Sequence, residues 1–246
     1  MTIDGRDGEH SESALRRSVL DAALAMSRRG LSPGRSGNIS SRFADGMLIT
    51  PSGMAYEGLE PSDIVFVGRD GGLRPGERKP SSEWRFHLDV YGARANIGGI
   101  VHTHSMHATV LACAHITIPA FHYMVAAAGG KEIPVVPYAT FGTAELSRHV
   151  VKGLTKTNAC LMANHGQIAV AATCEQALEL AADVEVLAEQ YWKLLAVAEP
   201  KLLPDDEMKR VLAHFKGYGQ NAQASRDATT PPIDRQRLPP AKRIST

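Results

Sequence analysis

The stretch Gly99–Ser105 constrains the fold most, because an apolar run there ends in two histidines that are one residue apart. If the run is a β-strand, its side chains alternate between the two faces. His102 and His104 would then project from the same face, roughly 7 Å apart. Two imidazoles at that separation can converge on one metal ion. Taken alone, such a pair more commonly consists of packed or solvated histidines. Metal binding is therefore indicated only if further ligands are found elsewhere in the chain.

Composition indicates an ordinary globular chain without a dominant charge. The 246 residues are 43% hydrophobic and 22% charged, which is enough for a large core in one domain or two. Lys plus Arg (27) nearly balance Asp plus Glu (26), so bulk charge does not indicate nucleic-acid or membrane binding. No apolar run approaches the roughly 20 residues of a transmembrane helix.

The N-terminus and the cysteines favour a cytoplasmic protein. Residues 1–10 are polar and contain no apolar core of a secretory signal. Cys113, Cys160 and Cys174 are an odd number and lack Cys-x-x-Cys spacing. We therefore expect reduced, structural thiols.

Hydrophobic periodicity predicts helices that alternate with short strands. The expected helices cover residues 11–29, 82–91, 108–113, 144–154, 173–197 and 203–218. The expected strands, besides the central one, cover residues 39–43, 47–50, 64–67, 159–162 and 168–171. The segment between the last two strands is Ala163–Gln167, whose Asn and Gly tolerate positive φ, so we predict a hairpin with His165 at its tip.

Three glycine- and serine-rich turns are candidate anion sites. Gly37 and Asn38 tolerate the positive φ that points successive N–H groups into one concavity, although a simple loop is the commoner explanation. Thr50–Gly53 repeats the pattern at the end of an apolar strand. Ser81 or Ser82 is expected to cap a helix, and a helix N-terminus favours negative charge.

Glu83, in the first turn of the same expected helix, has two interpretations. Acidic residues are favoured at this position because they complement the helix dipole. A carboxylate there is also a candidate metal ligand or base if the histidines lie nearby. By itself the position favours the capping role.

Jointly, the motifs resemble the zinc-dependent class II aldolase and adducin family, over roughly residues 15–219. The motifs that carry the resemblance are Gly37–Ser40, Ile49–Gly53, Pro80–His87, Val101–His104, His122–Met124, Tyr138–Thr143 and Asn164–Gly166. Each motif alone is weak evidence for the family, but the order and spacing of all seven together are specific to it. The resemblance implies an α/β fold: three αβα layers with a central mixed, mostly antiparallel sheet.

The resemblance also implies roles for individual residues. His102, His104 and His165 would hold one Zn²⁺ per subunit, and Glu83 would complete the resting shell and act as the acid/base. The substrate's phosphate would lie against Gly37, Asn38, Ser52, Gly53, Ser81 and Ser82. Phe141 would line the aldehyde end.

The implied reaction is the reversible aldol cleavage of a ketose 1-phosphate, such as L-fuculose 1-phosphate. The products would be dihydroxyacetone phosphate and a small aldehyde such as L-lactaldehyde, and the carbanion left on the first would be stabilised by zinc as an enediolate. Tyr123 is the candidate to exchange a proton with the aldehyde oxygen, and Tyr218 to close the pocket. In this family the first tyrosine comes from a neighbouring subunit, which implies a homo-oligomer, usually a C4 tetramer.

Related activities remain open at this point. Cleavage of 5-deoxyribulose 1-phosphate or its methylthio counterpart would differ only in the aldehyde half, and a dehydratase of the methylthio sugar would also use zinc and an acidic residue. Pentulose-5-phosphate 4-epimerases resemble the chain but carry aspartate where Glu83 stands. An adducin-like scaffold would not require the metal-binding residues.

Two regions are expected: a class II aldolase domain over residues 1–219 and a flexible polar tail over residues 220–246. The tail is basic and proline-bearing, with few apolar residues.

Overall fold

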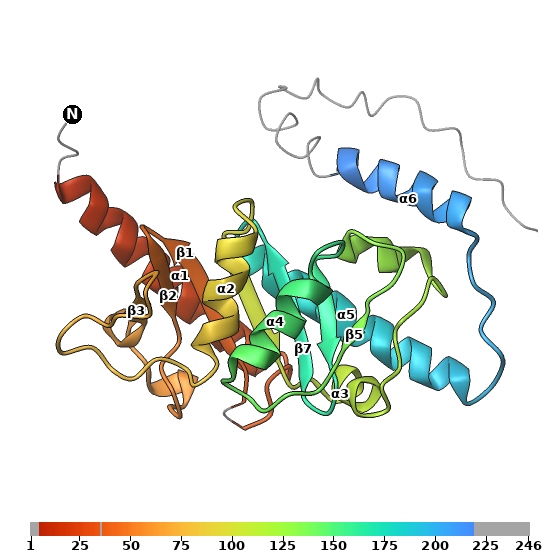
Figure 1. The fold of residues 1–246 in the computed structure, drawn as a ribbon, viewed down its shortest axis with the longest axis horizontal. Helices are drawn as coiled ribbons and strands as arrows, with labels where there is room; N and C mark the ends of the chain where they lie inside the picture. The colour runs from red at the N-terminus through yellow and green to blue at the C-terminus, as the bar shows by residue number, and fades with distance from the viewer. Residues whose placement is uncertain (1–4, 35, 219–246) are drawn as a thin grey trace, which may run out of the picture.

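Seven strands form one mixed sheet at the centre of the fold (Figure 1), in the order β3-β2-β1-β4-β7-β6-β5. The computed structural model describes residues 5–34 and 36–218, so the tail expected over residues 220–246 lies outside the described residues. The strands are β1 (Asn38–Phe43), β2 (Gly46–Ile49), β3 (Val65–Val67), β4 (Gly99–Thr103), β5 (Val135–Val136), β6 (Ala159–Met162) and β7 (Gly166–Ala171). Neighbours pair antiparallel except β5 and β6, which are parallel.

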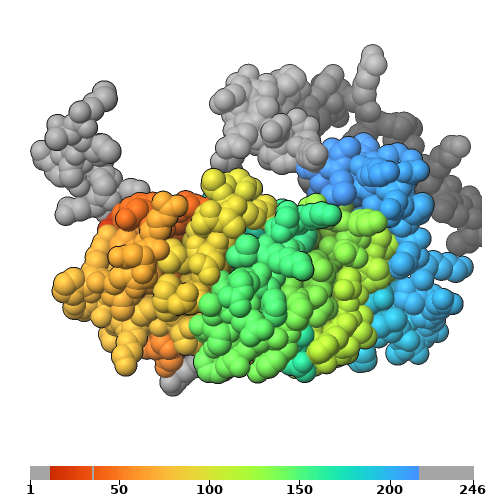
Figure 2. All heavy atoms as spheres, in the orientation of Figure 1, coloured from red at the N-terminus to blue at the C-terminus, as the bar shows by residue number. Residues whose placement is uncertain are grey.

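Helices cover both faces of this sheet. The α-helices are α1 (Gly5–Arg28), α2 (Trp84–Ala93), α3 (Met106–Cys113), α4 (Ala144–Gly153), α5 (Cys174–Leu195) and α6 (Asp205–Tyr218). Three short 3₁₀ helices, η1 (Tyr56–Gly58), η2 (Pro61–Asp63) and η3 (Tyr123–Ala128), lie in the connections. Figure 2 shows α2 and α4 side by side over one face, in yellow and green. None of the helices in the described ranges is long and apolar enough to cross a bilayer.

Alternation along the central strand β4 generates two cores. Ile100 packs with residues of α2 and α4, whereas Val101 packs with residues of α1, α3 and α5. Both side chains are fully buried, as expected for a strand with helices on both faces. The sequence-based fold class, three αβα layers around a mostly antiparallel sheet, is confirmed.

The start of α2 differs from the prediction. Neither Ser81 nor Ser82 is the N-cap, because the helix begins at Trp84 and Glu83 occupies the cap position. The Ser81 hydroxyl instead accepts a bond from the Glu83 N–H at 3.3 Å, which keeps residues 81–83 in a turn. The carboxylate of Glu83 is thereby left pointing away from its own helix.

The cysteines are unpaired, as expected. Cys160 and Cys174 are buried, and burial raises the pKa of the Cys160 thiol to about 12. That thiol is therefore protonated at neutral pH and has a packing role.

Candidate active site

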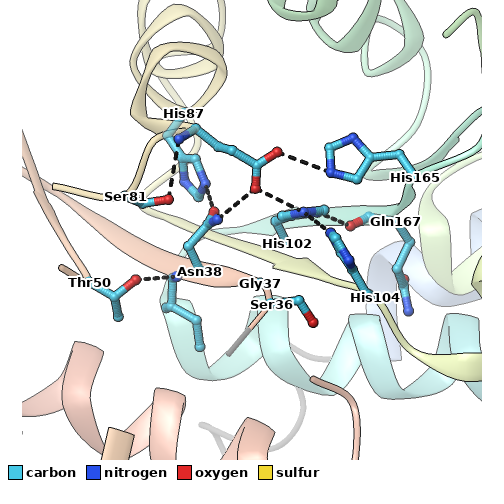
Figure 3. Close-up of polar contacts among 12 residues, drawn as sticks. Ser36, Gly37, Asn38, Thr50, Ser81, His87, His102, His104, His165 and Gln167 are labelled. Atoms are coloured by element: carbon cyan, nitrogen blue, oxygen red, sulfur yellow. Dashed lines mark hydrogen bonds and ion pairs between the residues drawn. The ribbon is translucent and has the colours of Figure 1, made fainter. Parts of the chain in front are cut away.

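Three histidines and one glutamate converge beside the end of β4. His102 lies on β4, His104 follows directly after it, His165 lies in the β6–β7 turn and Glu83 lies at the start of α2. Figure 3 shows the three imidazoles directed toward one another. One nitrogen or oxygen atom from each of the four side chains lies within 4.8 Å of the others. The structure thus brings together all four residues that sequence reasoning assigned to the metal.

The individual distances define a tight cluster. His102 Nε2 lies 3.0 Å from His104 Nε2 and 3.2 Å from Glu83 Oε2. The other carboxylate oxygen, Glu83 Oε1, lies 3.0 Å from His165 Nε2. Because the hairpin turn carries Asn164 at a φ of +54°, it can bring His165 back over the end of β4.

A backbone contact fixes which nitrogen of His102 faces the cluster. His102 Nδ1 lies 2.8 Å from the carbonyl oxygen of Gln167 on the neighbouring strand β7. A carbonyl only accepts, so Nδ1 carries the proton and Nε2 directs its lone pair toward the other imidazoles. Metal-binding histidines are oriented in this way. Sequence reasoning missed this contact, because it depends on strand register.

The donor set fits a divalent cation. Burial, together with the neighbouring imidazoles of His102 and His165, lowers the pKa of His104 to about 3, so its ring is neutral. Burial raises the pKa of Glu83, but the facing imidazoles outweigh burial and hold that pKa well below its usual range. Among the described residues, no donor of suitable geometry bonds the buried Oε1 of Glu83. Neutral imidazoles, a carboxylate and an unbonded buried oxygen together suit a metal ion.

A cleft with about 320 Å³ of space opens beside this cluster. All six residues predicted to contact phosphate line it, as does Phe141. Two backbone hydrogen bonds join the turns: Ser52 N–H donates to Lys79 O, and Ser81 N–H donates to Thr50 O, both at 3.0 Å. Sequence reasoning assigned no role to Tyr56 or Tyr138, which also border the cleft; Tyr138 begins one of the family motifs, whereas Tyr56 lies in none.

Asn38 lies in the cleft but its side chain has another partner. The Asn38 amide nitrogen lies 3.0 Å from Glu83 Oε2, so the amide donates to the carboxylate. Asn38 also pairs in register with His102 across β1 and β4. The amide therefore forms part of the carboxylate's surroundings.

Gly37 is required by a close approach between the cleft loop and β4. Its φ is +90°, and a Cβ atom there would lie 2.7 Å from the carbonyl oxygen of His102. Its own carbonyl accepts a hydrogen bond from the Tyr56 hydroxyl at 2.7 Å. The loop is thus fixed directly against the strand that carries His102.

We expect Gly37→Ala to lower the free energy of unfolding by about 2–4 kcal/mol, since backbone strain and a steric clash both oppose it. Gly34→Ala is the matched control, because its φ is +70° but no atom of the described residues, chain neighbours aside, lies within 4 Å of the added Cβ. Urea denaturation of the two variants measures the difference. If the two variants were destabilised equally, the clash with the His102 carbonyl oxygen would make no contribution.

Of the two predicted tyrosines, the structure places the side chain of Tyr123 alone, and it does not line the cleft of its own chain. Tyr123 begins η3, is 51% exposed and stacks on His122 at 4.8 Å between ring centroids, outside the cleft lining. Tyr218 is the last residue of α6, and its side chain lies outside the described part of the structure. Their predicted roles are therefore still predictions.

Comparison with known proteins identifies the family. The family model described as "Class II Aldolase and Adducin N-terminal domain" matches residues 17–192. The chain belongs to the class II aldolase and adducin family. It is a class II aldolase, since its similar relatives are aldolases.

Three relatives of this class II aldolase are informative. A 5-methylthioribulose-1-phosphate/5-deoxyribulose-1-phosphate aldolase from Rhodospirillum rubrum is 55% identical over 87% of this chain and 96% of its own length. An L-fuculose phosphate aldolase from Escherichia coli is 49% identical over 83% of this chain and 95% of its own length. The solved structure of an L-fuculose 1-phosphate aldolase superposes with a TM-score of 0.80 at 38% identity, covering 82% of this chain and 96% of that one.

Proposed function

We propose that this class II aldolase reversibly cleaves a ketose 1-phosphate into dihydroxyacetone phosphate and a small aldehyde. The observation that carries the proposal is the His102–His104–His165–Glu83 cluster at the side of a cleft lined by serines and glycines. A metal cluster next to hydroxyl groups suits a substrate that has both a carbonyl and a phosphate. The relatives reported above are named as aldolases, which favours cleavage over the epimerase, dehydratase and scaffold alternatives.

The three imidazoles would hold zinc, with Glu83 as a further ligand before substrate enters. Neutral nitrogen ligands are typical of catalytic zinc sites, which keep a position open for substrate. When bound, the ion would supply Lewis-acid polarisation of the substrate's carbonyl. The register of β4 with β7 keeps the His102 ring in the orientation required of a ligand.

Glu83 is the proposed acid and base. Its carboxylate is ionised and buried between imidazoles, and its Oε1 faces His165 Nε2 at 3.0 Å without hydrogen-bond geometry from any described residue. In condensation this carboxylate would take a proton from carbon 3 of dihydroxyacetone phosphate. In cleavage it would return that proton to the carbanion left on the same carbon.

The paired turns provide the proposed phosphate site. The contact between Ser52 N–H and Lys79 O brings residues 51–53 against residues 80–82. Ser52 and Ser82 are exposed to the cleft, so their hydroxyls can donate to phosphate oxygens. Gly37 and Gly53, both at positive φ, allow the backbone to approach the same group.

The aldehyde end favours a substrate whose terminal carbon carries no hydroxyl. Phe141 is 63% exposed and lines the cleft with Tyr138 and Met54. We place 5-deoxyribulose 1-phosphate and its methylthio counterpart first, because the Rhodospirillum relative is 55% identical. L-Fuculose 1-phosphate is the second candidate, because a relative named for it is 49% identical.

A panel of 1-phosphorylated ketoses that differ beyond carbon 4 tests the assignment. We expect kcat/KM for 5-deoxyribulose 1-phosphate to exceed that for L-fuculose 1-phosphate by about tenfold, the scale of a one-group difference in a pocket. Coupled detection of dihydroxyacetone phosphate measures both. The reverse ranking would favour the second candidate, and no cleavage of any panel member would refute the proposed function.

We further propose a cytoplasmic homo-oligomer, a C4 tetramer, in which Tyr123 reaches the active site of a neighbouring subunit. Support comes from its 51% exposure and its position outside the cleft of its own chain. A tyrosine hydroxyl at the aldehyde end could exchange a proton with the aldehyde oxygen. Tyr218 would close the same end.

A further inference from the structure

A line of buried polar side chains leads from Glu83 into the protein, away from the cleft. It consists of Asn38, His87, Ser40 and Tyr91, and each is at most 3% exposed. His87 and Tyr91 share one face of α2, since they are four residues apart, and Asn38 and Ser40 share one face of β1; Glu83 directly precedes α2. The two elements therefore present matching polar faces to each other between the sheet and α2.

Hydrogen-bond chemistry fixes the direction of every bond in this line. The Asn38 amide nitrogen lies 3.0 Å from Glu83 Oε2 and donates to it, because an amide nitrogen can only donate. The Asn38 oxygen consequently faces His87 Nε2, 2.5 Å away, which must carry the ring proton (Figure 3). One carboxylate thus determines both the amide orientation and the imidazole tautomer.

The same reasoning continues to the end of the line. His87 Nδ1 has no proton, so it accepts from the Ser40 hydroxyl at 2.7 Å. Ser40 has used its proton, so its oxygen accepts from the Tyr91 hydroxyl at 2.9 Å. The four hydrogen bonds thus run without a break from Glu83 to Tyr91, and such a continuous network is stable when buried.

The surroundings of His87 keep it neutral. Burial, together with the neighbouring His102, lowers its pKa to about 3. The Phe86 ring stacks on it, with centroids 4.8 Å apart, and limits its rotation. A neutral ring that is fixed in one tautomer can hold the Asn38 amide in one orientation.

We infer that His87 is a positioning residue for the aldol reaction: it orients the Asn38 amide, which holds Glu83 by Oε2 and leaves Oε1 to exchange the proton with substrate. The inference rests on the proposed function, because it assigns the proton transfer to Glu83. Without the imidazole N–H, the Asn38 amide could turn its oxygen toward the carboxylate. The resulting repulsion would displace Glu83 while leaving the three imidazoles in place.

The test compares His87→Leu with His87→Gln in the metal-loaded protein. Leucine removes the N–H, whereas glutamine can present an N–H to Asn38 and a carbonyl to Ser40. Residues that orient a metal site from outside typically contribute 10–100-fold, so we expect kcat to fall by about that factor in His87→Leu. We expect KM and zinc content to stay close to wild type, and Tm to fall, because leucine leaves buried polar atoms of Asn38 and Ser40 without a partner. We expect His87→Gln to recover most of kcat. His149→Leu, at a half-buried histidine outside the metal cluster, is the control for loss of an imidazole.

The outcomes separate the inference from the function on which it rests. Unchanged kcat in His87→Leu, or a loss of kcat accompanied by loss of zinc, would overturn the positioning role and leave the proposed function intact. If His87→Leu does not fold, Ser40→Ala replaces it, with a smaller expected loss of kcat under the same criteria. A wild-type protein without cleavage or proton exchange would overturn the proposed function instead. The nitrogen-15 spectrum of His87 tests the bond directions independently of activity: a proton on Nε2 supports them, and a proton on Nδ1 overturns them.

Discussion

Glu83→Gln is expected to reduce kcat for ketose 1-phosphate cleavage by about 10³-fold, within the range typical of a lost general acid or base. Glutamine has nearly the same shape as glutamate and can still accept the Asn38 amide bond, but it cannot take up or return a proton at neutral pH. The buried position of Glu83 between His102 and His165 leaves water little access to act in its place. Steady-state release of dihydroxyacetone phosphate measures the effect.

Glu132→Gln is the control for this substitution. Glu132 is exposed and does not line the cleft beside the metal cluster, so the same chemical change there should leave kcat unaltered. A Glu83→Gln variant with kcat within about tenfold of wild type would show that another group moves the proton.

His165→Ala should lower the affinity for zinc by at least about 100-fold, more than the loss of a residue that only orients a ligand. His165 lies in the β6–β7 turn and its side chain is 10% exposed, so alanine there removes a ligand with little disturbance of the sheet. The remaining imidazoles and Glu83 would leave the ion with an incomplete set of protein ligands. Competition with a chromophoric chelator measures the affinity.

His149→Ala serves as the comparison for ligand loss. This half-buried histidine bonds only the Pro137 carbonyl among its described hydrogen bonds and lies outside the metal cluster. Wild-type zinc affinity in His165→Ala would exclude that histidine as a ligand.

Local sequence pattern was sufficient for much of the fold. A threonine followed three residues later by glutamine, as in Thr173–Gln176, is typical of a helix start. The Thr173 side chain does accept a hydrogen bond from the Gln176 N–H at the start of α5. The Asn164–His165 turn between two apolar runs predicted the β6–β7 hairpin. In these places each residue's conformational preference agrees with the element that it joins, so the prediction needed no long-range information.

The metal cluster required more than pattern. The His102–His104 pair was ambiguous alone, and the family motifs supplied the connection to Glu83 and His165. Geometry then added what motifs do not contain. The bond from His102 to the Gln167 carbonyl depends on the register of β4 with β7, which joins residues that are far apart in the sequence.

The line of buried polar side chains behind Glu83 could not be predicted from the sequence, because it also depends on contacts between distant segments. Ser40, His87 and Tyr91 read as ordinary strand and helix residues until β1 and α2 are placed face to face. Asn38 was assigned to phosphate from its place after Gly37, whereas its amide donates to the Glu83 carboxylate. Sequence spacing predicts which face a residue occupies, but the partner on the opposite element emerges only from tertiary packing.

Proton exchange on dihydroxyacetone phosphate in D₂O is the most direct test of proton transfer by Glu83, because it isolates the half-reaction assigned to Glu83 and the metal cluster. We expect the wild-type protein to replace one carbon-3 hydrogen with deuterium in the absence of any aldehyde. We also expect chelation to abolish the exchange, added Zn²⁺ to restore it, and Glu83→Gln to lack it although zinc remains bound. Undiminished exchange by the metal-free protein would contradict the metal requirement, and undiminished exchange by Glu83→Gln would contradict the role of Glu83 as the base.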